Sequence, residues 1–463
     1  MIKDLTKGNP LKLIVYFALP VLIGNIFQQL FQISDILIVG RLLGVQSLAA
    51  VGASAPLFFM FLMVAFGFTA GLTVITAQRF GARDVTGIKS SVFHSLIAAG
   101  ILSIIITLCL ILFLKPLLRL MNVPAEIMDE AYSFMLVLGL SITAIVMYNL
   151  LSGFIRALGD SKTPLYFLIA SSILNIIFNF FFIYYMQWGV VGSASGTFFS
   201  MLISALACVW FIAKKFPLLQ ISWADCRYNH KFMMEHLKVS VPMALQFSIL
   251  AVSMMIIQSV CNSFGTDVIA GFTAAMRIEQ ISTQPLFAIG IACATFSAQN
   301  YGAALIRRIR QGVRLSLTAC FILSIIISLS VRFYGSHMVS AFIEDGNEGI
   351  VHIGQQYLLI SSYFYFFLSA IFVARNTLQG MGRTNIPLIS GTVELAIRAF
   401  AAVYLAKAVG YVGIFWSGPI AWIGGALVVC GGYFLVIRKL NPTEMRKIFL
   451  RKHALKYHMQ SLS

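Results

Sequence analysis

Twelve long apolar stretches run through this chain of 463 residues, and they constrain its fold more than any other feature. A helix needs about 20 predominantly apolar residues to cross the hydrocarbon layer of a membrane. Because lipid offers no partner to backbone N–H and C=O groups, such stretches predict helices rather than open strands. We therefore expect an all-α integral membrane protein. The predicted spans are 11–37, 47–78, 92–114, 131–155, 164–186, 190–213, 239–262, 268–298, 312–334, 353–379, 386–408 and 412–437.

The composition agrees with a membrane protein and excludes an ordinary soluble domain. Hydrophobic residues make up 59% of the chain and charged residues 11%, against roughly 25% charged residues in soluble proteins. A formal net charge of +17 would suit a nucleic-acid-binding protein. The basic residues, however, lie in short clusters between the apolar stretches, which is typical of loops that flank membrane spans.

Lysine and arginine residues gather in alternate loops. With the N-terminus inside, the cytosolic segments hold 25 of the 33, the outer loops hold five, and three lie within spans. Because positive loops stay in the cytosol, we predict a multi-pass protein of the bacterial inner membrane with both termini cytosolic. The central loop, 214–238, is expected to be a cytosolic linker. The basic tail, 438–463, is expected to lie against anionic lipid.

The sequence of the first half returns in the second half at an offset of 221 to 223 residues. Colinear matches at a nearly constant offset indicate a duplication. The matched segments are LGVQSLAAVGA at 43–53 with FGTDVIAGFTA at 264–274, AQRFGA at 77–82 with AQNYGA at 298–303, GDSKTP at 159–164 with GRTNIP at 382–387, GVVG at 189–192 with GYVG at 410–413, and Pro20 with Pro242.

Six spans per repeat mean that both copies enter the membrane from the same side. The duplication therefore predicts two parallel six-helix bundles, at 1–213 and 239–437, related by a pseudo-two-fold axis along the membrane normal. Bundles of this kind face each other across a central cleft, and rocking them gives alternating access. The repeat favours a carrier over a channel.

Asp35 is the most informative charge inside a predicted span. Asn25, Gln28, Gln32 and Asp35 lie on one face of a helix, and a polar stripe in an apolar span is expected to face water. Ionisable residues within the membrane are costly and mark ion or substrate pathways. Desolvation of such a carboxylate also favours its protonated form. The alternative is a solvated Asp35 at the outer edge of the membrane, near Arg41.

Further polar residues lie in three neighbouring spans. Asn175 and Asn179 occupy one face of the fifth span at spacing i, i+4. Asn149 in the fourth span and Thr197 in the sixth are candidates for the same cavity. Since Asn and Thr also bridge packed membrane helices without another role, both interpretations stay open.

Two acids lie within spans of the second half. Glu279 has no opposite charge on its own helical face, because Arg277 is two residues away, and we predict a role in a second-half cavity. Glu394 and Arg398 are spaced i, i+4 and are expected to neutralise each other. The aromatic segment 357–367 either packs against lipid or offers ring faces to cations.

The sequence lacks the patterns of an enzyme. No HExxH, Walker loop or serine nucleophile elbow is present. The seven cysteines show no metal-ligand spacing, and six of them lie in apolar stretches. We expect neither catalysis nor a cofactor.

Several segments together resemble the MATE family, the multidrug and toxic compound extrusion transporters. The resemblance covers nearly the whole chain. It rests on ALPVLIGNIFQQLFQISDILIVGRLLGVQSLAAVGA at 18–53, the paired AQRFGA and AQNYGA, SGFIRALGDSKTP at 152–164 and RIEQISTQP at 277–285.

This resemblance implies exchange of H+ or Na+ for small drugs that are often cationic and aromatic. Asp35 matches the first-span acid of ion coupling, and Asn149, Asn175 and Thr197 match polar positions of a first-half site that would hold Na+. Asn179 lies where several relatives carry a second Asp, so a Na+ site would lack one charge here. Glu279 resembles a second-half carboxylate implicated in drug binding in one branch of the family.

The resulting expectation is a secondary active multidrug antiporter, monomeric and without nucleic-acid partners. Two alternatives stay open: a lipid-linked oligosaccharide flippase of the same superfamily, and an integral-membrane enzyme or scaffold. The native substrate and the choice between H+ and Na+ are not fixed by the sequence. The predicted ion-coupling residues are Asp35, Asn149, Asn175, Asn179 and Thr197, and the predicted substrate-binding residues are Gln32, Asp35, Asn179 and Glu279.

Overall fold

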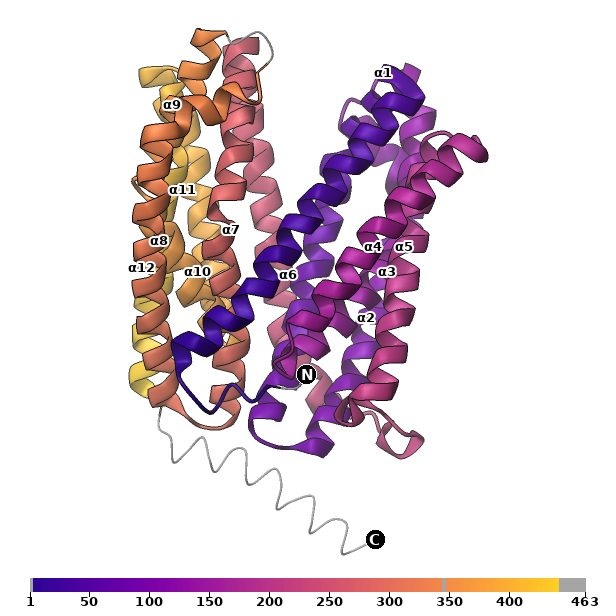
Figure 1. Ribbon diagram of the computed structural model, residues 1–463, viewed down its shortest axis with the longest axis vertical. Coiled ribbons are helices and arrows are strands. Elements are labelled where there is room, and N and C mark those ends of the chain that lie inside the picture. The colour runs from indigo at the N-terminus through magenta and orange to yellow at the C-terminus, as the bar shows by residue number, and fades with distance from the viewer. Residues whose placement is uncertain (1–2, 344–346, 441–463) are drawn as a thin grey trace, which may run out of the picture. The chain divides into compact units, whose positions relative to one another are not determined.

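The computed structural model describes residues 3–343 and 347–440, and all regular structure in these residues is helical. The last residues of the predicted basic tail therefore lie outside the described part. The helices, drawn in Figure 1, are α1 (Pro10–Gly81), α2 (Val85–Leu120), α3 (Met128–Ala157), α4 (Lys162–Phe180), α5 (Val190–Lys215), α6 (His230–Cys261), α7 (Thr266–Gly302), α8 (Ile306–Ser340), α9 (Glu348–Ser362), α10 (Tyr365–Gly380), α11 (Asn385–Val409) and α12 (Val412–Lys439).

The described helices supply the twelve predicted spans. α1 contains 72 residues, about 108 Å of helix, so it must contain two spans. They are separated at Gly44, whose φ of 85° and ψ of −173° are non-helical. The helices α9 and α10 are bent by 53° across a short break and together form one span. The predicted span 353–379 is therefore broken near its middle, and the predicted loop 38–46 is helical except at Gly44.

The chain divides into two compact units, and the start of the first span of each half belongs to the unit of the other half. Unit 1 contains Met1–Asp4 and Ile23–Ser248, and unit 2 contains Leu5–Leu22 and Ile249–Ser463. The start of α1 thus belongs to unit 2, and the start of α6 belongs to unit 1. The boundaries of these compact units differ in this respect from the predicted bundle boundaries at 213 and 239.

Each unit has its own apolar core. In unit 1, Leu72 of α1, Leu110 of α2 and Ile142 of α3 are completely buried in one cluster. In unit 2, the core includes Phe296 of α7 together with Phe17 from the start of α1. Burial of these side chains, at about 25 cal/mol per Å² of apolar surface, explains why the start of α1 stays with unit 2.

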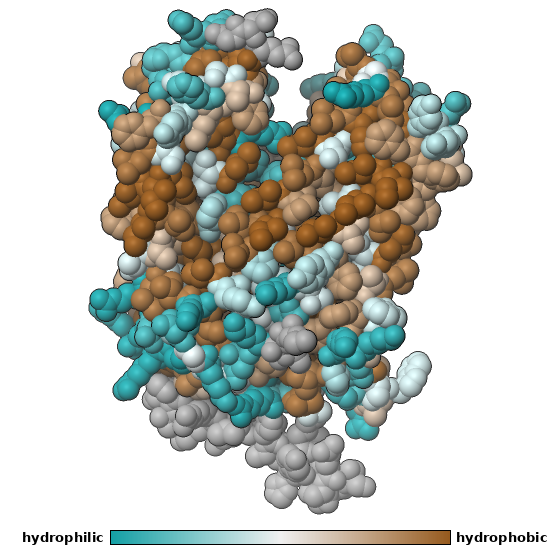
Figure 2. All heavy atoms as spheres, in the orientation of Figure 1, coloured by the Kyte–Doolittle hydropathy of each residue, from teal (hydrophilic) through white to brown (hydrophobic). Residues whose placement is uncertain are grey.

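The outer faces of the helices are apolar over most of their length. Figure 2 shows brown, hydrophobic residues along the helices and teal, hydrophilic residues towards their ends. On α2, for example, Ile104, Ile105 and Leu112 are more than half exposed. An apolar surface of this extent is the one expected to face lipid.

The start of α6 approaches the second half of α1 very closely in unit 1. A Cβ on Gly67 would lie 2.6 Å from the Met243 carbonyl oxygen, and one on Gly71 would lie 2.9 Å from the Ser240 Cβ. The Gly67-xxx-Gly71 pair is therefore a close-packing motif of the kind common between membrane helices.

The repeated motifs AQRFGA and AQNYGA hold the two exchanged segments. In unit 1, Arg79 of the first motif forms an ion pair with Glu235 at the start of α6 (3.3 Å). In unit 2, the side chain of Asn300 in the second motif donates to the carbonyl of Leu5, just before α1 (3.2 Å). Arg79 and Asn300 are equivalent under the 221-residue offset. Each repeat therefore binds the segment at the start of the other repeat's first span.

Candidate functional site

Asp35 lies in a connected polar cluster within unit 1. The half-buried Asp35 carboxylate of α1 accepts a short hydrogen bond from the Asn179 side-chain amide of α4. The same amide donates to Asn175 Oδ1 (3.2 Å), and Asn175 Nδ2 donates to Thr197 Oγ1 of α5 (3.3 Å). Three helices thus bring together four of the predicted ion-coupling residues. Asp35 is thus hydrogen-bonded to the protein, as the interpretation of a polar cluster within the membrane expects.

A glycine on α5 makes room for this cluster. A Cβ at Gly196 would clash with Asn179 Oδ1, so the approach of α5 to α4 depends on the missing side chain. Asn179 Oδ1 is buried and has no hydrogen-bond partner. An unpaired acceptor of this kind costs about 1–3 kcal/mol. It is therefore available to a protonated carboxyl or to a cation.

No basic side chain neutralises Asp35. Among the described residues the carboxylate takes part in no ion pair, and the partners given for it are neutral amides and a hydroxyl. Oxygen donors from carboxylate, amide and hydroxyl groups suit a hard cation. The arrangement therefore fits either a proton on Asp35 or a small cation beside it.

Two predicted residues lie apart from the cluster. Asn149 of α3 is half-buried, and no side-chain hydrogen bond joins it to Asp35 or its partners in the described part of the chain. The side chain of Gln32 is exposed on α1. Its place one turn before Asp35 keeps it on the polar stripe, but the structure gives it no contact with the cluster.

Glu279 of α7 lies in a second cluster, within unit 2. It is 8% exposed and accepts a short hydrogen bond from the Tyr357 hydroxyl of α9. Its other oxygen, Oε1, is buried without a partner. Glu279 resembles Asp35 in this respect, because both are carboxylates held by a neutral donor. Tyr357 was not singled out as a site residue, and its only sequence signal is its place in an aromatic segment.

Aromatic rings surround this second carboxylate. The Tyr357 ring packs edge-on against Phe272 (5.1 Å between centroids) and Phe415 (5.4 Å). Tyr365 is fully buried and its hydroxyl has no partner, whereas Tyr363 is 63% exposed. The segment 357–367 therefore lines the interior of the unit with some rings and its outer surface with others. A carboxylate among aromatic rings is a suitable environment for an organic cation.

The predicted pairing of Glu394 with Arg398 is wrong. Glu394 of α11 forms a close ion pair with Arg375 of α10 and also accepts from Ser390 Oγ (3.0 Å). The Arg398 side chain instead donates to Ser253 Oγ of α6 (3.1 Å) and acts electrostatically on Glu279. A partner on a neighbouring helix was invisible to an argument based on spacing along one helix. Arg277 is exposed.

The described residues contain no group of three or more His, Cys, Asp or Glu side chains that would hold a metal ion.

A family model described as MatE matches residues 20–181 and again 242–423. The two matches begin at Pro20 and Pro242, a pair found in the internal repeat. Together they cover most of the chain, so the repeat is a property of the family as well as of this sequence.

The chain is similar to proteins described as multidrug transporters. It is 30% identical over 380 residues to the probable multidrug resistance protein YpnP of Bacillus subtilis (strain 168), covering 82% of this chain and 84% of that protein. It is 21% identical over 421 residues to the multidrug export protein MepA of Staphylococcus aureus (strain MSSA476), covering 90% and 91%.

Solved structures show the same fold. One is an outward-facing multidrug resistance MATE family transporter of the MOP superfamily (25% identity, TM-score 0.88, 95% of this chain and 98% of that chain). Another is a MOP superfamily transporter from Pyrococcus furiosus described by the reverse polarity of its binding pocket (25% identity, TM-score 0.85, 94% and 98%).

Proposed function

Because the chain belongs to the MatE family, we propose that it is a secondary active exporter that exchanges H+ or Na+ for small organic cations. One observation carries the proposal: Asp35 is a carboxylate inside a membrane helix, bonded to the buried amide of Asn179 and not to a basic residue. An ionised group in such a place is costly and gains most from binding a proton or a cation.

Asp35 is the proposed coupling residue. Its deprotonated carboxylate accepts the Asn179 amide, which in turn holds Asn175 and, through it, Thr197. A proton or Na+ at Asp35 removes the negative charge that this chain of donors stabilises, so α1, α4 and α5 rearrange. An ion that binds one arrangement better than the other shifts the equilibrium by its differential affinity.

Exchange follows from competition for negative charge. A cationic drug and the coupling ion both lower the cost of a buried carboxylate, so binding of one weakens binding of the other. If the site opens to each side of the membrane in turn, the ion gradient drives the drug outward. We propose Gln32 and Asn179 as polar contacts of the drug and Glu279, with its aromatic neighbours, as a second anionic group for an organic cation.

The proposed orientation places both termini and the linker in the cytosol of a bacterium. It is supported by the 25 Lys and Arg residues in the predicted cytosolic segments and five in the outer loops. The exporter is proposed to act as a monomer, with membrane lipid around it.

The decisive experiment is ethidium efflux from proteoliposomes with proton and sodium gradients imposed separately. The wild type is expected to move ethidium under one of the two gradients. In Asp35→Asn the gradient-driven component is expected to disappear, because the amide cannot bind the coupling ion. Asp267→Asn, which changes an exposed acid at the start of α7, is the matched control and should transport normally.

Full gradient-driven efflux in Asp35→Asn would overturn the coupling role. Absence of ethidium movement in folded wild-type protein under both gradients would overturn the drug antiporter and favour the second candidate, a flippase for lipid-linked oligosaccharides. Arg398 is the observation behind that candidate: it is a buried guanidinium without a carboxylate partner among the described ion pairs. The two acids that are held by neutral donors, Asp35 in unit 1 and Glu279 in unit 2, make an anion site the weaker proposal.

A further inference from the structure

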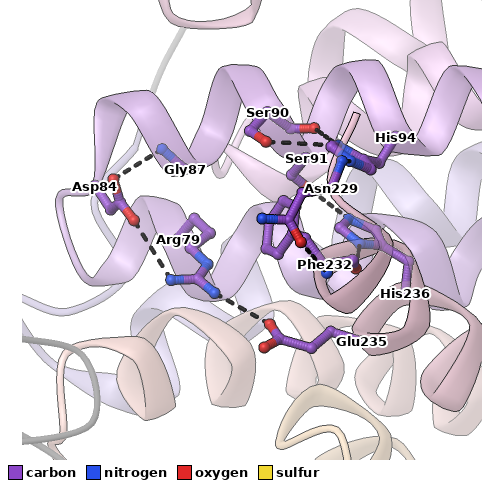
Figure 3. A network of polar contacts seen from close by, with 10 residues as sticks. All are labelled: Arg79, Asp84, Gly87, Ser90, Ser91, His94, Asn229, Phe232, Glu235 and His236. Atoms are coloured by element: carbon purple, nitrogen blue, oxygen red, sulfur yellow. Dashed lines mark hydrogen bonds and ion pairs between the residues drawn. The ribbon is translucent and has the colours of Figure 1, made fainter. Parts of the chain in front are cut away.

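A network of polar contacts at one end of unit 1 is not used by the proposed exchange cycle. Figure 3 shows two histidines, His94 of α2 and His236 of α6, beside the end of the linker that leads into α6. Both side chains are completely buried. Their rings are stacked with centroids 6.2 Å apart and an interplanar angle of 16°. Buried histidines with specific partners on two different elements are candidates for a proton-sensitive contact.

The partners of His94 determine its protonation state. His94 Nδ1 lies 2.7 Å from the Ser90 carbonyl oxygen, which only accepts, so Nδ1 carries the hydrogen. His94 Nε2 lies 2.9 Å from the backbone nitrogen of Asn229, which only donates, so Nε2 must offer a lone pair. Both assignments follow from the partners. Together they require a neutral ring.

His236 is less restricted. Its Nδ1 donates to the Phe232 carbonyl (2.8 Å), and its Nε2 lies 2.8 Å from Ser91 Oγ. The Ser91 hydroxyl also lies 2.9 Å from Thr76 Oγ1, and it can rotate to accept a hydrogen bond. The hydrogen-bond partners of His236 fit either protonation state of its ring, whereas the backbone N–H that faces His94 can only donate.

The charged groups around the rings come from four elements. Arg79 of α1 lies 5.1 Å above the Phe232 ring and is bonded to Asp84 (3.4 Å) and Glu235 (3.3 Å). Phe232 itself packs edge-on against both histidines. From the linker, Tyr228 stacks on His94 at 5.7 Å. The acids Asp84 and Glu235 are thus both engaged by Arg79.

A further ion pair joins Lys89 of α2 to Asp225 of the linker, with 3.3 Å between Lys89 Nζ and Asp225 Oδ2.

We propose that His94 is a proton-sensitive fastener that holds the end of the linker to α2 and releases it when the ring is protonated. A second N–H at Nε2 would face the N–H of Asn229 at 2.9 Å and replace a hydrogen bond by a repulsion. The fastener is therefore closed when His94 is neutral and opens when the ring takes up a second proton as the pH falls.

A second contact of the linker responds to pH differently. The Asp225 carboxylate accepts from Ser222 N (3.0 Å) and Ser222 Oγ (2.8 Å) and pairs with Lys89. The hydrogen bonds from Ser222, with a smaller contribution from Lys89, lower the pKa of Asp225 below its usual value. A carboxyl with a lowered pKa keeps its contact above its ordinary value near 4 and loses it only on further acidification. The Asp225 contact is therefore kept as the pH falls from 7.5 to 5.5, whereas the contact at His94 is the one that protonation breaks.

Release at His94 would act on the first turn of α6. The Asn229 side chain accepts from Phe232 N (3.2 Å), and its carbonyl accepts from Met233 N (2.9 Å), which are the bonds of an N-cap. α6 passes from unit 1 to unit 2 at Ser248 and Ile249. Protonation would thus loosen the start of a helix shared by the two units.

The test is a nitroxide spin label on Cys226, three residues before Asn229, in the full-length protein. The half-buried Cys109 and Cys430 are replaced by Ala, and the remaining four cysteines are buried. The line shape is recorded from pH 7.5 to 5.5, after labelling, so titration of the thiol does not interfere. In the protein with His94 the label is expected to become mobile as the pH falls.

His94→Gln is the informative variant, because its amide oxygen accepts from Asn229 N–H at every pH. The mobile component should be absent from it throughout the titration. His352→Gln, which changes an exposed histidine on α9, is the matched control and should keep the transition. A transition that survives in His94→Gln, is lost in His352→Gln, or is absent with His94 in place would overturn the proposal.

Hydrogen exchange of the Asn229 amide is a second measurement that needs no variant. Relative to its intrinsic rate, exchange is expected to accelerate as the pH falls from 7.5 to 5.5, because protonation of His94 breaks the hydrogen bond that protects this amide. Unchanged protection across this interval would overturn the fastener even if His94→Gln failed to fold.

Discussion

The three acids within the predicted spans differ in what neutralises them. Asp35 and Glu279 are held by neutral donors, Asn179 and Tyr357. Glu394 is paired with Arg375. A carboxylate with a fixed cationic partner gains little from another cation, whereas one with neutral partners gains a great deal. The first two are therefore the ones suited to transient ligands.

Glu279→Gln and Glu394→Gln are expected to fail in different ways. Removing the charge at Glu279 should weaken binding of a cationic drug about tenfold, equivalent to about 1.4 kcal/mol, with little effect on thermal stability. Removing it at Glu394 leaves Arg375 buried and unpaired and should destabilise the protein by about 3 kcal/mol. Ethidium binding and thermal unfolding of the purified variants separate the two effects. Equal loss of affinity in both variants would contradict the distinction.

The Asp35 cluster could be predicted in part from the sequence. The helical face through Asn175 and Asn179 and the resemblance of Asp35 and Thr197 to family positions brought four residues to one place. Asn149 was included as a polar residue of a neighbouring span and for its resemblance to a family position, and it has no side-chain hydrogen bond to the others in the described residues. Tyr357 could not be predicted as a partner of Glu279 because the two are 78 residues apart. Such a pairing depends on how helices pack, which hydropathy does not encode.

At the scale of the helices, two glycines determine how closely α6 approaches α1. The backbone of Ser240 and the carbonyl of Met243 occupy the space that side chains at Gly71 and Gly67 would fill. Membrane helices lack a strong hydrophobic drive to associate, so close van der Waals contact contributes much of their packing energy. This contact attaches the start of α6 to unit 1.

Gly71→Ala is expected to push α6 away from α1 and to destabilise unit 1 by about 1–3 kcal/mol, the usual range for overpacking. Gly52→Ala on the same helix is the control, because a Cβ there meets nothing within 4 Å. Thermal unfolding in detergent, followed by size-exclusion chromatography, should show a lower midpoint only for Gly71→Ala. An equal fall of the unfolding midpoint in both variants would mean that the lost stability comes from changing α1 itself and not from its contact with α6.

Hydropathy predicted the number and order of the spans but not where the helices bend or break. The first two spans are one helix interrupted only at Gly44, because the short connection between them stays helical on both sides. The tenth span is broken between Ser362 and Tyr365. Aromatic residues continue through the break in the tenth span, so composition gives no signal for it. Between the first two spans the sequence predicts a loop, and only the backbone geometry shows that this segment is helical except at Gly44.

At the scale of the whole molecule, the two units share the chain in a reciprocal way. Unit 2 contains Leu5–Leu22 from the first repeat, and unit 1 contains the start of α6 from the second. The AQxxGA motifs were recognised from the sequence as a repeat, but their role in fixing these segments was not. A motif shows that two positions are equivalent without showing what they bind.

Asn300→Ala is expected to loosen the entry of α1 into unit 2. It removes the side-chain donor to Leu5 O and should lower stability by about 1 kcal/mol, since Arg308 still donates to Leu5 and Gly8. Trypsin cleavage at Lys7 should become faster. Asn262→Ala, at an exposed asparagine before α7, is the control, and equally fast cleavage in both variants would argue against the anchoring role.

The reciprocal exchange has a consequence for how such a chain can arise. A single repeat expressed by itself would present a first-span segment that fits the core of a neighbour and would leave its own core without one. Two identical copies would satisfy both by trading those segments, which is the arrangement of a domain-swapped dimer. Joining the two copies through a linker such as 214–238 makes this exchange of segments intramolecular. Neither half is then an independent folding unit.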